Sequence, residues 1–134
     1  MLLLSCKQVT GINAVSIHKD GYLLQKTVTR LPKDLGLYGN YIEGFKRAFI
    51  ALSLYMERNG YDESVVVECN SEVFVNWLKS GSCPKEFAEK FKEMWMELDK
   101  LPVMYTVVRS KKVQAERYAK ESELPKYKLE SLDI

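Results

Sequence analysis

The sequence has few of the residues from which several kinds of protein are built. Its three cysteines are odd in number and irregularly spaced, so no disulfide framework is expected. No apolar run approaches the roughly 18 residues that a membrane helix needs. There is one histidine and no closely spaced cysteine pair, so we predict no metal site. Because no glycine-rich phosphate-binding motif occurs, we also predict no nucleotide cofactor.

The length and composition fit one folded domain. The chain has 134 residues, with 20 Lys and Arg against 18 Asp and Glu, which gives a net charge of +2. Apolar residues make up 46% and charged residues 28%, which is typical of a globular protein rather than a disordered one. We predict a domain over residues 1–123, a C-terminal tail over residues 124–134 and a cytoplasmic location without a membrane partner.

The first thirty residues alternate between apolar and polar side chains as strands do. This pattern predicts three strands, at Leu2–Val9, Ile12–His18 and Tyr22–Leu31. Asp20 and Gly21 form a tight-turn signal between the second and third strands, because glycine readily adopts positive φ. We therefore expect an antiparallel meander, followed by a loop over residues 32–39.

After this loop, helical and extended patterns alternate. Helices are predicted from Tyr41 to Asn59, through Phe74, Trp77 and Leu78, from near Pro84 to Leu98, and over Val113–Glu121. Strands are predicted at Ser64–Cys69 and Val103–Val108. Strands that are separated by helices usually join a sheet in parallel. The predicted fold class is α/β, with a mixed sheet of three antiparallel and two parallel strands and helices on both faces.

This order of elements resembles the ribonuclease H fold from Leu2 to about Ser122. Residues 40–45 with Ala51-Leu52 resemble the start of the family's first helix. Residues 66–71 resemble the strand that ends in Asp-Ser. Residues 107–109 followed by 115–119 resemble the last strand and the helix that carries an Asp. The resemblance implies nucleic acid as partner and hydrolysis of a phosphodiester by two metal ions.

That chemistry needs carboxylates at the matched positions, and this sequence has none there. The resemblance places the first-strand position on Ser5 or Cys6 and the others on Gly44, Asn70 and Ala119. We therefore predict an inactive member of the superfamily, a pseudoenzyme without catalytic residues, cofactor or metal. A viral, phage or retroelement source is compatible with such a small degenerate member.

In an alternative interpretation, the protein is an active metal-dependent nuclease whose carboxylates are displaced from the matched positions. Glu43, Glu68 and Glu116 lie one to three residues from the matched positions, so a shifted register would let them bind Mg²⁺. The first-strand acid would still be missing, because the earliest acidic residue is Asp20.

A basic cluster near the C-terminus is the predicted nucleic-acid site. Over residues 103–120 there is one acid, Glu116, and the cations are Arg109, Lys111, Lys112, Arg117 and Lys120. In the resembled fold this loop and helix border the nucleic-acid groove, and we expect Lys46 and Arg47 to add to the same face. Solvated lysines that only keep the protein soluble would give the same pattern. The partner is thus predicted to be RNA, DNA or their hybrid, with a protein partner as the alternative and the oligomeric state open.

Two further groups of residues have both structural and functional interpretations. Cys6 and Cys69 would either form a thiol or metal pair with His18 or be buried apolar residues, and we favour the second. His18 itself is expected at a surface or edge. Four tyrosines would offer stacking surfaces for bases or a protein contact, and Trp77 and Trp95 are expected in the core. The tyrosines are Tyr38, Tyr41, Tyr105 and Tyr118.

Overall fold

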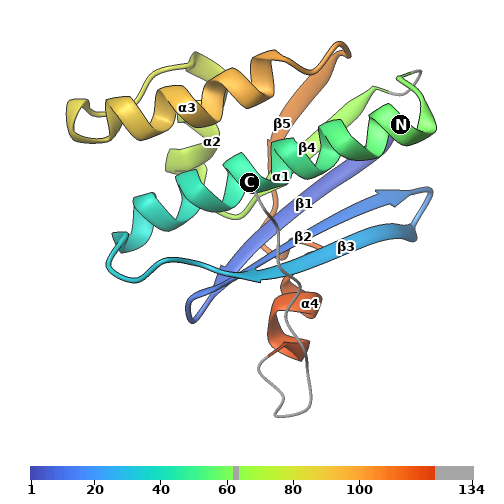
Figure 1. Cartoon of the computed structure of the whole chain (residues 1–134), viewed down its shortest axis with the longest axis horizontal. Coiled ribbons are helices and arrows are strands. Elements are labelled where there is room, and N and C mark those ends of the chain that lie inside the picture. The colour runs from blue at the N-terminus through green and yellow to red at the C-terminus, as the bar shows by residue number, and fades with distance from the viewer. Residues whose placement is uncertain (62–63, 123–134) are drawn as a thin grey trace.

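The computed structural model describes residues 1–61 and 64–122. The tail predicted over residues 124–134, and residue 123 at the predicted domain boundary, lie outside the described residues. The strands are β1 (Leu2–Val9), β2 (Ile12–Lys19), β3 (Tyr22–Arg30), β4 (Val65–Cys69) and β5 (Tyr105–Arg109). The helices are α1 (Gly36–Asn59), α2 (Glu72–Ser80), the 3₁₀ turn η1 (Lys85–Phe87), α3 (Ala88–Asp99) and α4 (Glu116–Glu121) (Figure 1).

The strands form one open sheet in the order β3-β2-β1-β4-β5. The first three strands pair antiparallel, whereas β4 pairs parallel with both β1 and β5. The predicted mixed sheet is therefore confirmed, and β3 and β5 are its two edges. The carboxyl ends of β1, β4 and β5 point the same way, so the segments that follow these strands gather at one end of the sheet.

Helices cover the two faces of the sheet unequally, as Figure 1 shows. Helix α1 packs on β1 and β2 and against α3, and the large apolar cluster on this face also includes residues of α2. The short helix α4 contacts β1, β2 and β3 from the opposite side. We call these the α1 face and the α4 face.

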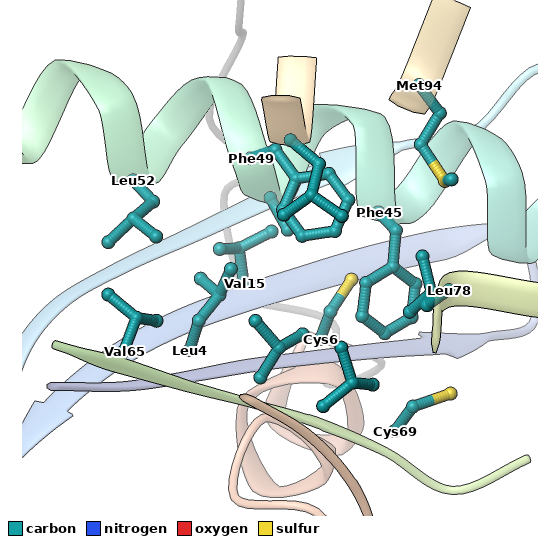
Figure 2. Packing of buried hydrophobic residues seen from close by; sticks show 14 of the residues in the cluster. Leu4, Cys6, Val15, Phe45, Phe49, Leu52, Val65, Cys69, Leu78 and Met94 are labelled. Atoms are coloured by element: carbon teal, nitrogen blue, oxygen red, sulfur yellow. The ribbon is translucent and has the colours of Figure 1, made fainter. Parts of the chain in front are cut away.

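The α1 face holds most of the hydrophobic core (Figure 2). Phe45, Phe49 and Leu52 descend from α1 onto Leu4 and Val15 of the sheet, and the side chains of all five are almost wholly buried. Side chains alternate along β1, so Leu4 and Cys6 face α1 while Ser5 faces α4. This alternation decides which predicted site residues can meet.

Three predicted boundaries need correction. Helix α1 begins at Gly36 instead of Tyr41, so residues 36–39 of the predicted loop are helical. Glycines at 36 and 39 suggested a loop, but Tyr38 in this first turn packs its ring on Trp77, 4.8 Å between centroids, and such tertiary contact overrides local propensity. Strand β5 starts at Tyr105 rather than Val103, and α4 at Glu116 rather than Val113.

None of the helices within residues 1–61 and 64–122 combines the length and the apolar character that a membrane crossing requires.

Candidate nucleic-acid interface

Four residues meet between β1, β2 and α1, and we call them the amide–thiol cluster: Cys6, Gln8, Asn13 and Gly44. The Gln8 Nε2 group donates to Asn13 Oδ1 at 2.9 Å and to Cys6 Sγ at 3.2 Å. The Cys6 thiol donates to the same Asn13 oxygen at 3.2 Å, and Asn13 Nδ2 lies 3.4 Å from the Gly44 carbonyl oxygen. Uncharged groups from β1, β2 and α1 thus satisfy one another's hydrogen-bonding capacity.

Gly44 is the residue that makes room for this cluster. A Cβ atom at position 44 would lie 2.6 Å from Asn13 Oδ1 and closer still to Gln8 Nε2. Real Cβ atoms are essentially never found that close to another heavy atom. Any side chain on α1 at this point therefore requires Gln8 and Asn13 to move.

The two buried thiols are poor metal ligands. Burial, and then the neighbouring Cys69, raise the pKa of Cys6 well above its usual value. Burial likewise raises the pKa of Cys69 to about 11. Metals bind the thiolate, and both groups keep their protons at neutral pH. His18 lies on the other face, so the alternative of a Cys6–Cys69–His18 site is wrong and the two cysteines are buried residues of the core.

The structure separates the positions that the resemblance assigns to catalytic carboxylates. Cys6 and Gly44 both belong to the amide–thiol cluster, whereas Ser5 faces α4. Ala119 is fully buried against β2 and β3 with Ala14 and Val28, on the α4 face. Asn70 follows β4 and is partly exposed, next to Ser71, whose hydroxyl caps α2 by accepting the Phe74 N–H at 3.2 Å.

The glutamates proposed as displaced metal ligands are not brought together. Glu43 on α1 accepts from Arg47 Nε at 3.1 Å, and Glu68 on the other face accepts from the Gln114 N–H at 2.6 Å. Glu116 pairs with Lys120 at 3.8 Å. Across residues 1–61 and 64–122, no three His, Cys, Asp or Glu side chains are arranged to hold a metal ion.

The predicted basic residues run from the last residue of β5 to α4, and we call them the basic segment: Arg109, Lys111, Lys112, Arg117 and Lys120. All five are exposed to solvent, and the side chains of Arg117 and Lys120 are 76% and 63% accessible. The segment borders a surface hollow of about 440 Å³ whose lining includes Lys112, Arg117 and Lys120. Several long, positively charged side chains could therefore contact one extended ligand at this hollow.

Lys46 and Arg47 do not join this group, so their prediction on the same face is wrong. Arg47 donates to Thr29 Oγ1 at 2.9 Å and to the Arg30 carbonyl at 2.7 Å, and only 14% of its side chain is accessible. Lys46 lies 3.9 Å from Glu93 of α3. Both belong to α1, on the face opposite α4, and Arg47 ties that helix to β3.

A row of buried polar side chains lies beneath α4 and the loop before it: Ser5, Ser16, His18 and Glu68. Ser5 pairs in register with Ser16 on one side and with Glu68 on the other. His18 Nε2 lies 2.7 Å from Ser16 Oγ, and its ring stacks on Tyr118 of α4 at 6.3 Å between centroids. His18 is only 6% exposed, so its expected surface position is wrong. Burial lowers the pKa of His18, and the negative charge of Glu68 offsets part of that effect.

The aromatic residues are mainly structural. Tyr41 stacks on Phe74 at 5.3 Å, and half-buried Trp77 and Trp95 pack against the core. Tyr118 is 8% exposed, which removes it as a stacking surface for bases.

Sequence reasoning missed Gln8, Asn13 and Ser16. Amides and hydroxyls on strands carry no motif, and only the register of β1 and β2 shows that Gln8 lies opposite Asn13 and Ser5 opposite Ser16.

Comparisons with known proteins identify the fold. No family model and no curated protein sequence matches the chain. Among solved structures, LC11-RNase H1 in complex with an RNA/DNA hybrid superposes with a TM-score of 0.64 at 17% identity, covering 90% of this chain and 93% of that one. The N-terminal RNase H domain of a Mycobacterium tuberculosis protein superposes with a TM-score of 0.59 at 10% identity, covering 90% of this chain and 91% of that one. RNase H1 from the archaeon Halobacterium salinarum superposes with a TM-score of 0.53 at 11% identity, covering 81% of this chain and 83% of that one. The chain described here therefore has the ribonuclease H-like fold.

Proposed function

We propose that this protein is a non-catalytic module that binds nucleic acid through its basic segment. The observation that carries the proposal is the amide–thiol cluster. The resemblance assigns two of the metal-binding carboxylates to Ser5 or Cys6 and to Gly44. Of these, Cys6 and Gly44 belong to the cluster, where the chain has a protonated thiol and no side chain. Gln8 and Asn13 fill the space instead.

The chemistry of the cluster supports the absence of catalysis. Two-metal hydrolysis of a phosphodiester needs anionic oxygens that hold both cations at the scissile phosphate. The Asn13 oxygen is neutral and already accepts hydrogen bonds from Gln8 and Cys6. A divalent cation would therefore lose part of its hydration shell without gaining a charged ligand.

The basic segment supports nucleic acid as the partner. Arg117 and Lys120 extend into solvent from α4, and Lys111 and Lys112 do so from the loop before it. Cations in this arrangement can contact successive phosphates and release counterions, which makes binding salt-dependent. LC11-RNase H1, which has the same fold, is known in complex with an RNA/DNA hybrid. We expect the protein to act in the cytoplasm, where its three free cysteines stay reduced.

The test is a titration of labelled single-stranded, duplex and hybrid oligonucleotides at two salt concentrations. We expect binding that weakens steeply with salt. Replacing Lys111 and Lys112 by Glu should weaken it about tenfold or more, while the same change at Lys90 and Lys92 is the matched control. Those control lysines are also exposed but lie on α3, on the α1 face. No binding at low salt, or equal losses in the two variants, would contradict the proposal.

A protein partner is the second candidate. It is favoured by three consecutive apolar residues at the start of edge strand β3, where Tyr22, Leu23 and Leu24 are 75%, 40% and 42% exposed. A partner that is retained at high salt and lost on replacing these three residues by polar ones would support this candidate instead.

A further inference from the structure

Two buried acceptors on adjacent strands hold the loop that carries part of the basic segment. Glu68 Oε1 on β4 accepts the backbone N–H of Gln114 at 2.6 Å, and Ser5 Oγ on β1 accepts that of Ala115 at 2.8 Å. The two side chains are register partners, and they are 6% and 0% exposed. Residues 114 and 115 are separated from Lys111 and Lys112 by Val113 alone and lie directly before α4.

We propose that Ser5 and Glu68 are positioning residues for nucleic-acid binding. By fixing the backbone at residues 114 and 115, they hold the loop lysines and the cations of α4 in one arrangement before the ligand arrives. This inference rests on the function proposed above. Cations that are ordered in advance cost less conformational entropy when they contact phosphates.

The size of the α4 contact explains why these two hydrogen bonds matter. Helix α4 has six residues, and the apolar cluster through which it packs on the sheet has six buried members, of which Tyr118 and Ala119 belong to the helix itself. A small apolar contact leaves much of the docking to polar groups. A hydrogen bond to a carboxylate is also roughly twice as strong as one between neutral groups. Glu68 is thus an acidic residue that positions a cationic surface through its hydrogen bond to the Gln114 backbone, without contacting the ligand itself.

Ser16 provides a natural control for this role. It lies in the same buried row, is 0% exposed and is the register partner of Ser5 on the other side. Its hydroxyl contacts His18 at 2.7 Å instead of the loop. Removing the Ser16 hydroxyl disturbs the same polar row but leaves the two loop hydrogen bonds in place.

The experiment combines amide hydrogen exchange with oligonucleotide affinity in the full chain, using Glu68→Ala, Glu68→Gln, Ser5→Ala and Ser16→Ala. In the unmodified protein, the amides of Gln114 and Ala115 should exchange slowly. Glu68→Ala and Ser5→Ala should speed exchange at these amides and weaken binding several-fold. They should also reduce the slope of log affinity against log salt by about 1–2, because fewer cations reach phosphate together. Glu68→Gln, which keeps an acceptor oxygen, should recover part of both effects, and Ser16→Ala should change neither.

If Glu68→Ala fails to fold, Ser5→Ala and Glu68→Gln carry the test. The inference is overturned if exchange at residues 114 and 115 accelerates while the affinity and the salt slope stay unchanged. It is also overturned if Ser16→Ala has the same effect on binding as Ser5→Ala. Loss of protection in the variants, in a protein that binds no oligonucleotide at all, would instead show that the proposed function has failed, and the inference with it.

Discussion

The two faces of the sheet differ in what their residues do. On the α1 face, three helices bury aromatic and aliphatic side chains such as Phe45 and Phe49 against the sheet. On the α4 face, one short helix covers a small apolar cluster and a row of buried polar groups, and it presents its cations outward. From this contrast we expect the α1 face to supply most of the stability, whereas the α4 face presents the binding surface that we propose.

The largest expected effect comes from truncating the core of the α1 face. Phe49→Ala should lower the free energy of unfolding by about 3–5 kcal/mol, because Phe49 is 0% exposed and its removal leaves a cavity. Chemical denaturation measures this loss. Leu54→Ala on the same helix is the control, since Leu54 is 45% exposed and should cost about 0.5 kcal/mol or less. Similar losses in the two variants would contradict the assignment of the helix faces.

The second prediction concerns the amide–thiol cluster. Replacing a helical glycine by alanine usually stabilises a protein by up to about 1 kcal/mol. Gly44→Ala should instead destabilise this one by about 1–3 kcal/mol, because its methyl group would overlap Gln8 and Asn13. Adding Gln8→Ala to Gly44→Ala should recover part of the loss in a double-mutant cycle. A stabilising Gly44→Ala would show that the space beside Gly44 is open.

The third prediction compares one arginine from each face. Arg47→Ala should lower stability by about 1–3 kcal/mol, because Arg47 joins α1 to Thr29 and Arg30 of β3, but it should leave nucleic-acid affinity unchanged. Arg117→Ala should do the reverse. Its side chain is 76% accessible, so stability should change by about 0.5 kcal/mol or less while the salt slope of binding falls by about 1. Denaturation and titration of both variants check this, and an affinity loss in Arg47→Ala would break the division between the faces.

The smallest expected effect is a dependence of stability on pH. Burial lowers the pKa of His18, so the folded state binds a proton at this ring more weakly than the unfolded state does. The resulting stability is present above the usual histidine pKa of about 6.5 and is lost as the pH falls below it. Denaturation between about pH 7.5 and 5.5 should show this decline. His18→Gln should flatten it, since the chain has one histidine. An unchanged decline in His18→Gln would assign it to another group.

The sequence was sufficient for the order and direction of the strands, because turn signals and helix periods mark them directly. The sequence was also sufficient to predict that the basic segment is exposed, because charged side chains on a loop and a short helix usually remain in contact with solvent. It failed where two elements meet. Arg47 looks like one more surface cation until the contact of α1 with β3 is known. The alternation along its strand predicts an exposed position for His18, and only the contact with Tyr118 of α4 shows that it is covered. Gln8 and Asn13 gain significance only from the register of β1 and β2 and from the missing side chain at Gly44.

The most direct test of the account is the affinity of the unmodified protein for an RNA–DNA hybrid in excess Mg²⁺ or Mn²⁺ and in a chelator, at matched ionic strength. The fate of both strands is followed by gel electrophoresis in the same samples. Since neutral groups occupy the amide–thiol cluster, we expect equal affinity in all conditions and intact strands. Binding that requires the divalent ion, or cleavage of either strand, would contradict the proposal that this protein is a non-catalytic nucleic-acid-binding module.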